Sequence, residues 1–141
     1  MTDTEYKKEK ERIRLLAKKW IKPLGLNWWR INLAYARDDF HEEIRDNNSY
    51  TNNGVAASCS AEPNYLHATI TFYLRVTKTM PDDELEEAFI HELMHIFLSP
   101  MSTDEKEDEE ERVATTLARG FVWIMEHYSE KTKKVGKKRK S

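Results

Sequence analysis

Cysteine is almost absent from the sequence, which limits how the fold can be held together. Cys59 is the only cysteine among 141 residues, so no disulfide can form within the chain. A cysteine-poor chain of this size is typical of a reducing compartment. The simplest role for Cys59 is that of a small buried residue. It could ligate zinc only if its strand crossed a metal site.

Long hydrophobic runs are also missing. No window approaches the roughly 18–20 apolar residues that a membrane span needs. Residues 1–16 are charged throughout and lack the apolar segment of a signal peptide. We therefore expect a cytoplasmic protein with no membrane partner.

Charge is abundant but unevenly placed along the chain. The net charge is −2, yet residues 104–111 ("DEKEDEEE") are almost wholly acidic, whereas residues 131–141 contain seven basic residues and no acidic one. Such a basic tail can contact nucleic acid or another acidic partner, or it can be a solvated, flexible end. Because no aromatic residues are interleaved with the lysines, the sequence favours a disordered tail after a single domain, residues 1–130.

Hydrophobic periodicity predicts a small α+β domain. The expected elements, in order, are a helix at 5–21, strands at 28–36, 55–62 and 64–76, and helices at 80–98 and about 106–129. Residues 37–54 are polar and rich in turn residues, which predicts either a loop or a short helix followed by a turn. One helix, three strands and two further helices favour a mainly antiparallel sheet.

The segment "FIHELMHIFLSP" (89–100) carries the most specific signal. His91 and His95 are four residues apart, so on a helix they lie on one face and can offer imidazole nitrogens to one ion. Glu92 lies about 100° around the helix from His91, where it can exchange a proton with a metal-activated water. This H-E-x-x-H spacing predicts a zinc site with Glu92 as general base and acid.

The alternative is an ordinary amphipathic helix that happens to hold these three residues. The neighbouring side chains are apolar on almost every side, which predicts a buried helix. Burying a glutamate and two histidines without partners costs several kcal/mol. The metal site therefore explains the segment better than a plain core helix.

A third protein ligand is needed, and the remaining histidines are poor candidates. His41 falls in the polar loop, His67 beside strand residues, and His127 off the apolar stripe of the last helix. Each is more simply a surface or edge histidine.

A carboxylate at the start of the final helix is the better candidate for this ligand. We expect that helix to bury one apolar stripe, made of Val113, Ala114, Leu117, Phe121, Ile124 and Tyr128. One turn before Val113, Glu110 lies at the centre of this stripe and Glu111 at its edge. We predict Glu110 as the ligand and keep Glu111 as the alternative; the other acidic residues there suit a solvated loop and a helix N-terminus.

Taken together, these segments resemble the minimal gluzincin-type metallopeptidase domains of the ImmA/IrrE-like group and their phage- and prophage-encoded relatives. The matching segments are 24–35 ("LGLNWWRINLAY"), 64–74 ("NYLHATITFYL"), 84–100 ("ELEEAFIHELMHIFLSP") and 110–121 ("EERVATTLARGF"). They span nearly the whole domain, although only the H-E-x-x-H segment is sharply specific.

The resemblance implies a zincin-like domain with one zinc ion held by His91, His95 and a glutamate. It also implies that 64–74 is an edge strand beside the cleft, where an extended peptide could pair. The implied function is a zinc-dependent endopeptidase of narrow specificity acting on a protein or peptide. The rival hypothesis is a metal-stabilised binding or regulatory protein on the same scaffold, with little or no turnover. A glutamate beside the first histidine favours the enzyme, because a closed structural zinc site does not need it.

Overall fold

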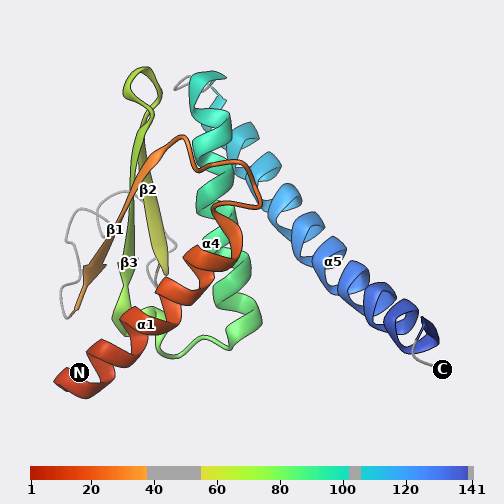
Figure 1. Ribbon diagram of the computed structural model, residues 1–141. Coiled ribbons are helices and arrows are strands. Elements are labelled where there is room, and N and C mark those ends of the chain that lie inside the picture. The colour runs from red at the N-terminus through yellow and green to blue at the C-terminus, as the bar shows by residue number, and fades with distance from the viewer. Residues whose placement is uncertain (38–54, 102–105, 140–141) are drawn as a thin grey trace.

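The computed structural model describes residues 1–37, 55–101 and 106–139. It confirms an α+β architecture of helices and a three-stranded sheet (Figure 1). The main elements are α1 (Asp3–Trp20), β1 (Arg30–Ala36), β2 (Ala57–Glu62), β3 (His67–Tyr73), α4 (Asp82–Leu98) and α5 (Glu107–Arg139). The short helical segments are η1 (Pro63–Tyr65), α3 (Leu74–Thr77) and η2 (Ser99–Met101). The loop or short helix predicted at 37–54 lies outside the described residues, except for residue 37.

The sheet is mixed, which corrects the mainly antiparallel sheet expected from the sequence. Its order is β1-β3-β2, with β3 parallel to β1 and antiparallel to β2. The tight η1 turn makes β2 and β3 antiparallel neighbours, whereas β1 pairs with β3 after a long connection, as a parallel pair requires. The segment expected to form an edge strand is therefore the central strand β3, and β2 is the edge strand on the side of α4.

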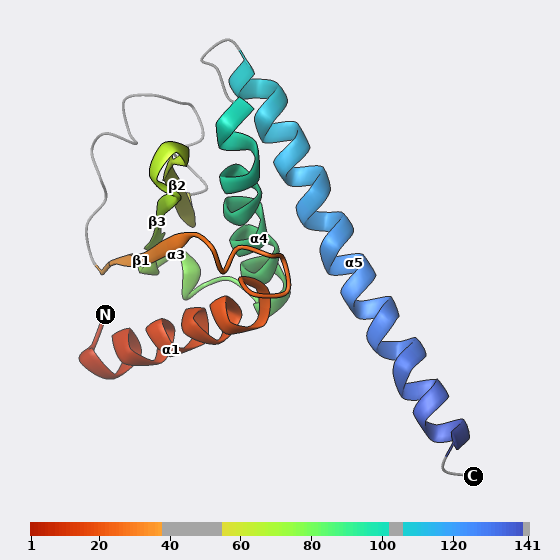
Figure 2. The ribbon, with the colours of Figure 1, turned by 45° about the horizontal axis from the view of Figure 1, so that its top comes forward.

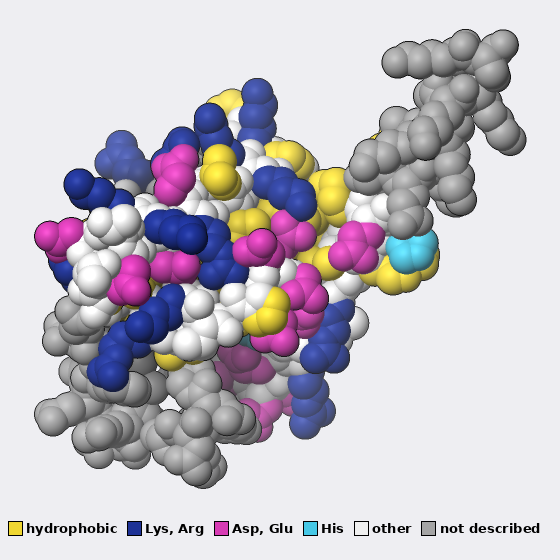
Figure 3. Space-filling view, turned by 90° about the horizontal axis from the view of Figure 1, so that it is seen from below, with side chains coloured by type: hydrophobic (Ala, Val, Ile, Leu, Met, Phe, Trp, Pro, Cys, Tyr) yellow, Lys and Arg dark blue, Asp and Glu magenta, His cyan; other side chains and the backbone are white. Residues whose placement is uncertain are grey.

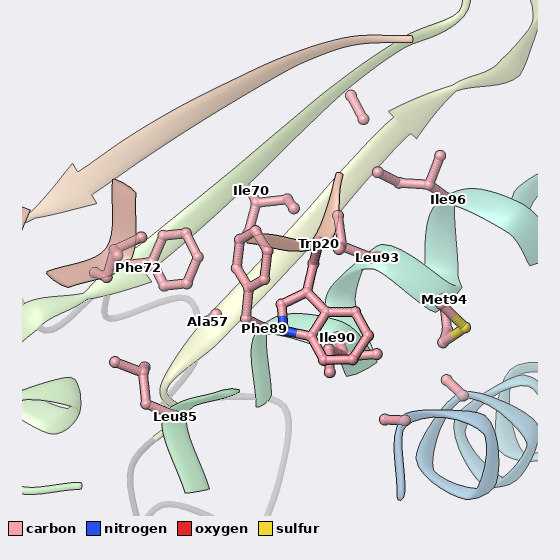
Figure 4. Close-up of a cluster of buried hydrophobic side chains, with 14 of the residues drawn as sticks. Trp20, Ala57, Ile70, Phe72, Leu85, Phe89, Ile90, Leu93, Met94 and Ile96 are labelled. Atoms are coloured by element: carbon pink, nitrogen blue, oxygen red, sulfur yellow. The ribbon is translucent and has the colours of Figure 1, made fainter. Parts of the chain in front are cut away.

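The core lies between the sheet and the helices α1 and α4 (Figure 4). Alternate residues of β3 face it, so that Ile70 and Phe72 are fully buried. The ring of Phe72 stacks on that of Phe89 of α4, with centroids 5.7 Å apart. Trp20, at the end of α1, is also buried in this cluster. The core thus fixes α4 against the inner face of the sheet.

The two last helices lie side by side at the start of α5 and then separate (Figures 1 and 2). Ala114 and Ala118 are the fully buried residues of α5. The stripe predicted to be buried is mostly exposed: it leaves 43% of Val113, 38% of Leu117 and 55% of Ile124 open to solvent.

Ala114 belongs to both the predicted and the observed buried face, so the buried face of α5 is rotated from the prediction by less than one residue, that is, by under about 100°. The small side chains of the alanines allow α4 and α5 to approach closely. Packing through this face is therefore favoured over packing through the adjacent face of larger apolar residues. Phe121 is only partly buried against the core, and Tyr128 is 69% exposed.

The last helix is longer than the sequence suggested. Residues 131–139, expected to belong to a disordered tail, continue α5 without interruption to Arg139. Lysine and arginine are good helix formers, and their positive charges favour the C-terminal end of the helix dipole. No helix in the described part of the chain is long and apolar enough to cross a membrane.

Candidate metal centre

Helix α4 positions the two histidines of the H-E-x-x-H segment. Three acidic residues, Asp82, Asp83 and Glu84, lie in its first turn and complement the positive end of its dipole. Its buried side packs against the core, and both histidines are partly buried on the side that α5 covers. The four-residue spacing places their rings 4.8 Å apart between centroids.

Three ligand-type groups converge where the start of α5 meets α4. The Nε2 atoms of His91 and His95 lie 3.1 Å apart. Oε2 of Glu111 lies 3.1 Å from Nε2 of His91, and Oε1 of Glu111 lies 2.9 Å from Nε2 of His95. His91, His95 and Glu111 thus form the one cluster of metal-ligand side chains found among the described residues.

The second nitrogen of each imidazole has its own partner. Nδ1 of His95 lies 2.8 Å from Oε1 of Glu110, and Nδ1 of His91 lies 3.2 Å from the hydroxyl oxygen of Thr115. Such contacts orient metal-binding histidines and fix which nitrogen faces the metal. Glu110, predicted as the ligand, therefore lies behind His95, while Glu111, the alternative, lies with the two Nε2 atoms.

The donor set and its spacing suit a zinc ion. Two imidazole nitrogens and a carboxylate oxygen are typical zinc ligands, and a tetrahedral ion with bonds of about 2.0–2.1 Å separates its ligands by about 3.3 Å. The two Nε2 atoms, 3.1 Å apart, need to separate only slightly, and each of them has a different oxygen of Glu111 within 3.1 Å. Because Glu111 retains a 54% exposed side chain, the cluster is open to solvent on one side.

Glu92 is the buried carboxylate of the site. It is only 9% exposed, and no described residue donates a hydrogen bond to it. Burial, assisted by the negative charge of Glu111, raises the pKa of Glu92 to about 8. A buried carboxylic acid whose pKa lies near neutrality is suited to proton transfer.

Burial also lowers the pKa of His91; the neighbouring His95 acts in the same direction, and Glu111 opposes the shift. Imidazole must be neutral at its ligating nitrogen to bind a metal, so a lowered pKa favours the ligand form.

Cys59 lies on β2 near this centre without joining it. Burial, together with the charges of Glu92 and Glu110, raises the pKa of its thiol to about 12. The thiol is therefore protonated at neutral pH in the metal-free protein, and Cys59 is not among the ligand-type groups that cluster there. This position agrees with the role of a small, largely buried residue expected from the sequence.

A cleft of about 380 Å³ opens beside the centre. The start of β2 forms one wall through Val55 and Ala57, and α4 forms the other through residues that include Glu87, His91 and Glu92. Thr115 of α5 also lines it. The cleft thus leads from an edge strand, unpaired on this side by the described strands, to His91 and to the buried carboxylate of Glu92.

The other histidines take no part in the cluster. The ring Nε2 of His67 lies 3.0 Å from the side-chain amide nitrogen of Asn32. His127 is exposed, stacks on Trp123 and approaches the carbonyl oxygen of that residue at 2.8 Å. His41 lies outside the described residues.

Sequence reasoning did not assign a role to Thr115. It follows Glu111 by four residues, so both lie on one face of α5. The same spacing links His91 and His95 on α4, and this parallel could have indicated Thr115.

Comparisons with protein-family models, with curated proteins and with solved structures find no match to this chain. The functional inference therefore rests on the arrangement of His91, Glu92, His95, Glu110 and Glu111.

Proposed function

We propose that this chain is a zinc-dependent peptidase that hydrolyses peptide bonds in the cleft between β2 and α4. The observation that carries the proposal is the convergence of His91, His95 and Glu111, with the buried Glu92 beside them. A chance helix does not require a second helix to supply a carboxylate to the same point, nor partners for both Nδ1 atoms.

Each residue of the site would have its own role in such a reaction. His91, His95 and Glu111 would hold the ion, with Thr115 and Glu110 fixing the two rings from behind. A zinc ion bound there would acidify water and polarise the scissile carbonyl. Glu92 would accept the proton of the attacking water and return it to the leaving amine.

The exposed edge of β2 suggests how a peptide would bind. Of the described strands only β3 pairs with β2, and the start of β2 lines the cleft. An extended peptide could add to this edge through backbone hydrogen bonds, with alternate side chains directed into the cleft. In this proposal β2, and not the segment 64–74, would supply the edge strand that the family resemblance implied.

Purified wild-type protein and a Glu92→Gln variant would test the proposal directly. We expect both to contain stoichiometric zinc by elemental analysis, because Glu92 is not a ligand. Only the wild type should cleave members of a peptide library. Glu86→Gln is a matched control on the same helix, since Glu86 pairs with Lys19 of α1 and does not line the cleft.

Three results would contradict the proposal. A folded preparation that binds no zinc, even when zinc is added, would remove the metal centre. Zinc binding without cleavage by the wild type, across a library of all sequence classes, would favour the metal-stabilised binding protein. Cleavage that survives in the Glu92→Gln variant would assign the chemistry elsewhere.

A further inference from the structure

Helix α5 carries an exposed apolar stripe that the fold leaves uncovered. Val113, Leu117 and Ile124 are 43%, 38% and 55% exposed, and Tyr128 is 69% exposed. Their spacing of three to four residues, with Gly120 included, places them on one side of the helix. Figure 3 shows hydrophobic side chains gathered where the end of the chain leaves the body of the molecule. Contiguous apolar surface of this kind marks interaction sites.

Gly120 lies within the stripe, and no close contact with the described residues requires a glycine there. A Cβ atom added to it would meet no heavy atom within 4 Å among the described residues. Glycine weakens the interior of a helix relative to alanine, so its presence there has no explanation in this fold. A glycine on an exposed helical face allows another backbone or a large side chain to approach closely.

The charges of α5 identify the partner and its direction. The first turn of the helix is acidic (Glu107, Asp108, Glu109 and Glu110). Its last turns, from residue 131 onwards, hold basic residues and no acidic one. The stripe lies between these two ends. Two copies of this helix in antiparallel orientation would set each acidic end beside a basic end, whereas a parallel pair would oppose like charges.

We propose that the chain forms an antiparallel homodimer through this stripe of α5. In the register that aligns opposite charges, Gly120 of each copy receives Ile124 of the other copy. Leu117 then meets the turn that holds Tyr128, and Val113 lies near residue 131. This contact is isologous and two-fold symmetric, as in most homodimers. It accounts for the apolar stripe, the glycine and the charge reversal together, and it does not depend on the proposed peptidase activity.

Sedimentation equilibrium of the full chain in reducing buffer would test the dimer. We expect the average mass to rise from 16.7 kDa towards twice that value as the concentration increases to the order of 100 μM, the range of weak homodimers. Gly120→Gln should weaken association by at least about tenfold. The same variant should keep or raise its melting temperature, because the added side chain meets open space in the monomer.

A second variant and a salt series complete the test. Ile124→Glu should also abolish association, whereas Glu126→Gln, an exposed position on another side of the helix, should leave it unchanged. Added salt should weaken an antiparallel dimer and strengthen a parallel one, because only the former pairs opposite charges.

Three outcomes would overturn the proposal. The first is a wild-type chain that stays monomeric over the whole concentration range. The second is a dimer that Gly120→Gln leaves intact. The third is a monomer that binds anionic phospholipid vesicles through the same residues, which would identify the stripe as a membrane-binding face.

Discussion

Glu92 is a buried carboxyl group, and ionising it has a thermodynamic cost in the metal-free protein. Its carboxyl group ionises near pH 4.5 in the unfolded chain and near pH 8 in the fold. Between these values the folded protein retains a proton that the unfolded chain has released. The free energy of unfolding therefore falls as the pH rises through this window.

Glu92→Gln should remove this pH dependence, because glutamine resembles the neutral acid and does not titrate. In chelator, we expect the variant to match the wild type at about pH 5 and to exceed its free energy of unfolding by on the order of 3 kcal/mol at about pH 9. Urea unfolding at both pH values measures the difference. Equal stability of the two proteins at high pH would show that the carboxylate is hydrated in the fold.

The two neighbouring glutamates at the start of α5 should differ in their effect on zinc affinity. Glu111→Gln removes a ligand, so we expect a loss of well over about 100-fold, whereas Glu110→Gln removes only the partner of His95 Nδ1 and should cost about 10–100-fold. Competition with a chromophoric chelator would measure both affinities. The reverse order would restore Glu110 as the ligand that the sequence predicted.

At the scale of elements, Arg12 connects α1 to the segment that leads into α4. Its guanidinium group donates hydrogen bonds to the carbonyl oxygens of Thr77 and Met80, at 3.1 and 2.6 Å, and to the carboxylate of Asp82 at 2.7 Å. Glu9, which is only 8% exposed, lies 3.4 Å from the same group. These hydrogen bonds fix where α4 begins, and therefore where His91 and His95 lie relative to the sheet.

Arg12→Ala should lower the free energy of unfolding by about 2 kcal/mol, because it leaves the largely buried carboxylate of Glu9 and two carbonyl groups with fewer partners. Arg14→Ala is the matched control on the same helix. Arg14 pairs only with Glu11 on an open surface, and we expect no measurable change. Thermal or urea unfolding compares the two variants, and equal losses would show that the network is not structural.

The sequence was informative where local chemistry decides the structure. The H-E-x-x-H spacing placed His91 and His95 on one face of a buried helix, and hydrophobic periodicity located that helix and the strand β3. The sequence was uninformative where two different ways of packing a helix compete. Helix α5 offers one face of small alanines and another of larger apolar residues, and only packing against α4 selects between them. That choice places Glu111 at the Nε2 atoms of both histidines and Glu110 at Nδ1 of His95.

At the scale of the whole molecule, a bound metal ion would link two helices that are attached to the core to different extents. Helix α4 lies in the core, whereas α5 is attached through two fully buried alanines, a few partly buried residues and an ion pair between Arg119 and Glu87. Two ligands come from α4 and one from α5. An ion held between them would therefore restrain the less firmly held helix.

Zinc should consequently raise the stability of the protein, by about 4 kcal/mol when free zinc exceeds its dissociation constant 1,000-fold. Hydrogen exchange should slow most in the first turns of α5, where Glu111 lies. His91→Ala is the control, since it removes one ligand and should show neither effect. A zinc-induced stabilisation that persists in this variant would place the ion at another site.

Because α5 is one continuous helix, a change in its tilt at one point also moves residues near its ends. This helix of 33 residues carries the proposed ligand Glu111 near its start and, at its middle, the surface proposed for self-association. If pairing of two chains shifts the tilt of this helix, it changes the position of Glu111, and the ion and the second chain become mutual effectors. Thermodynamic linkage then requires that, if zinc increases the affinity of the two chains for each other by some factor, the dimer binds zinc more tightly than the monomer by the same factor.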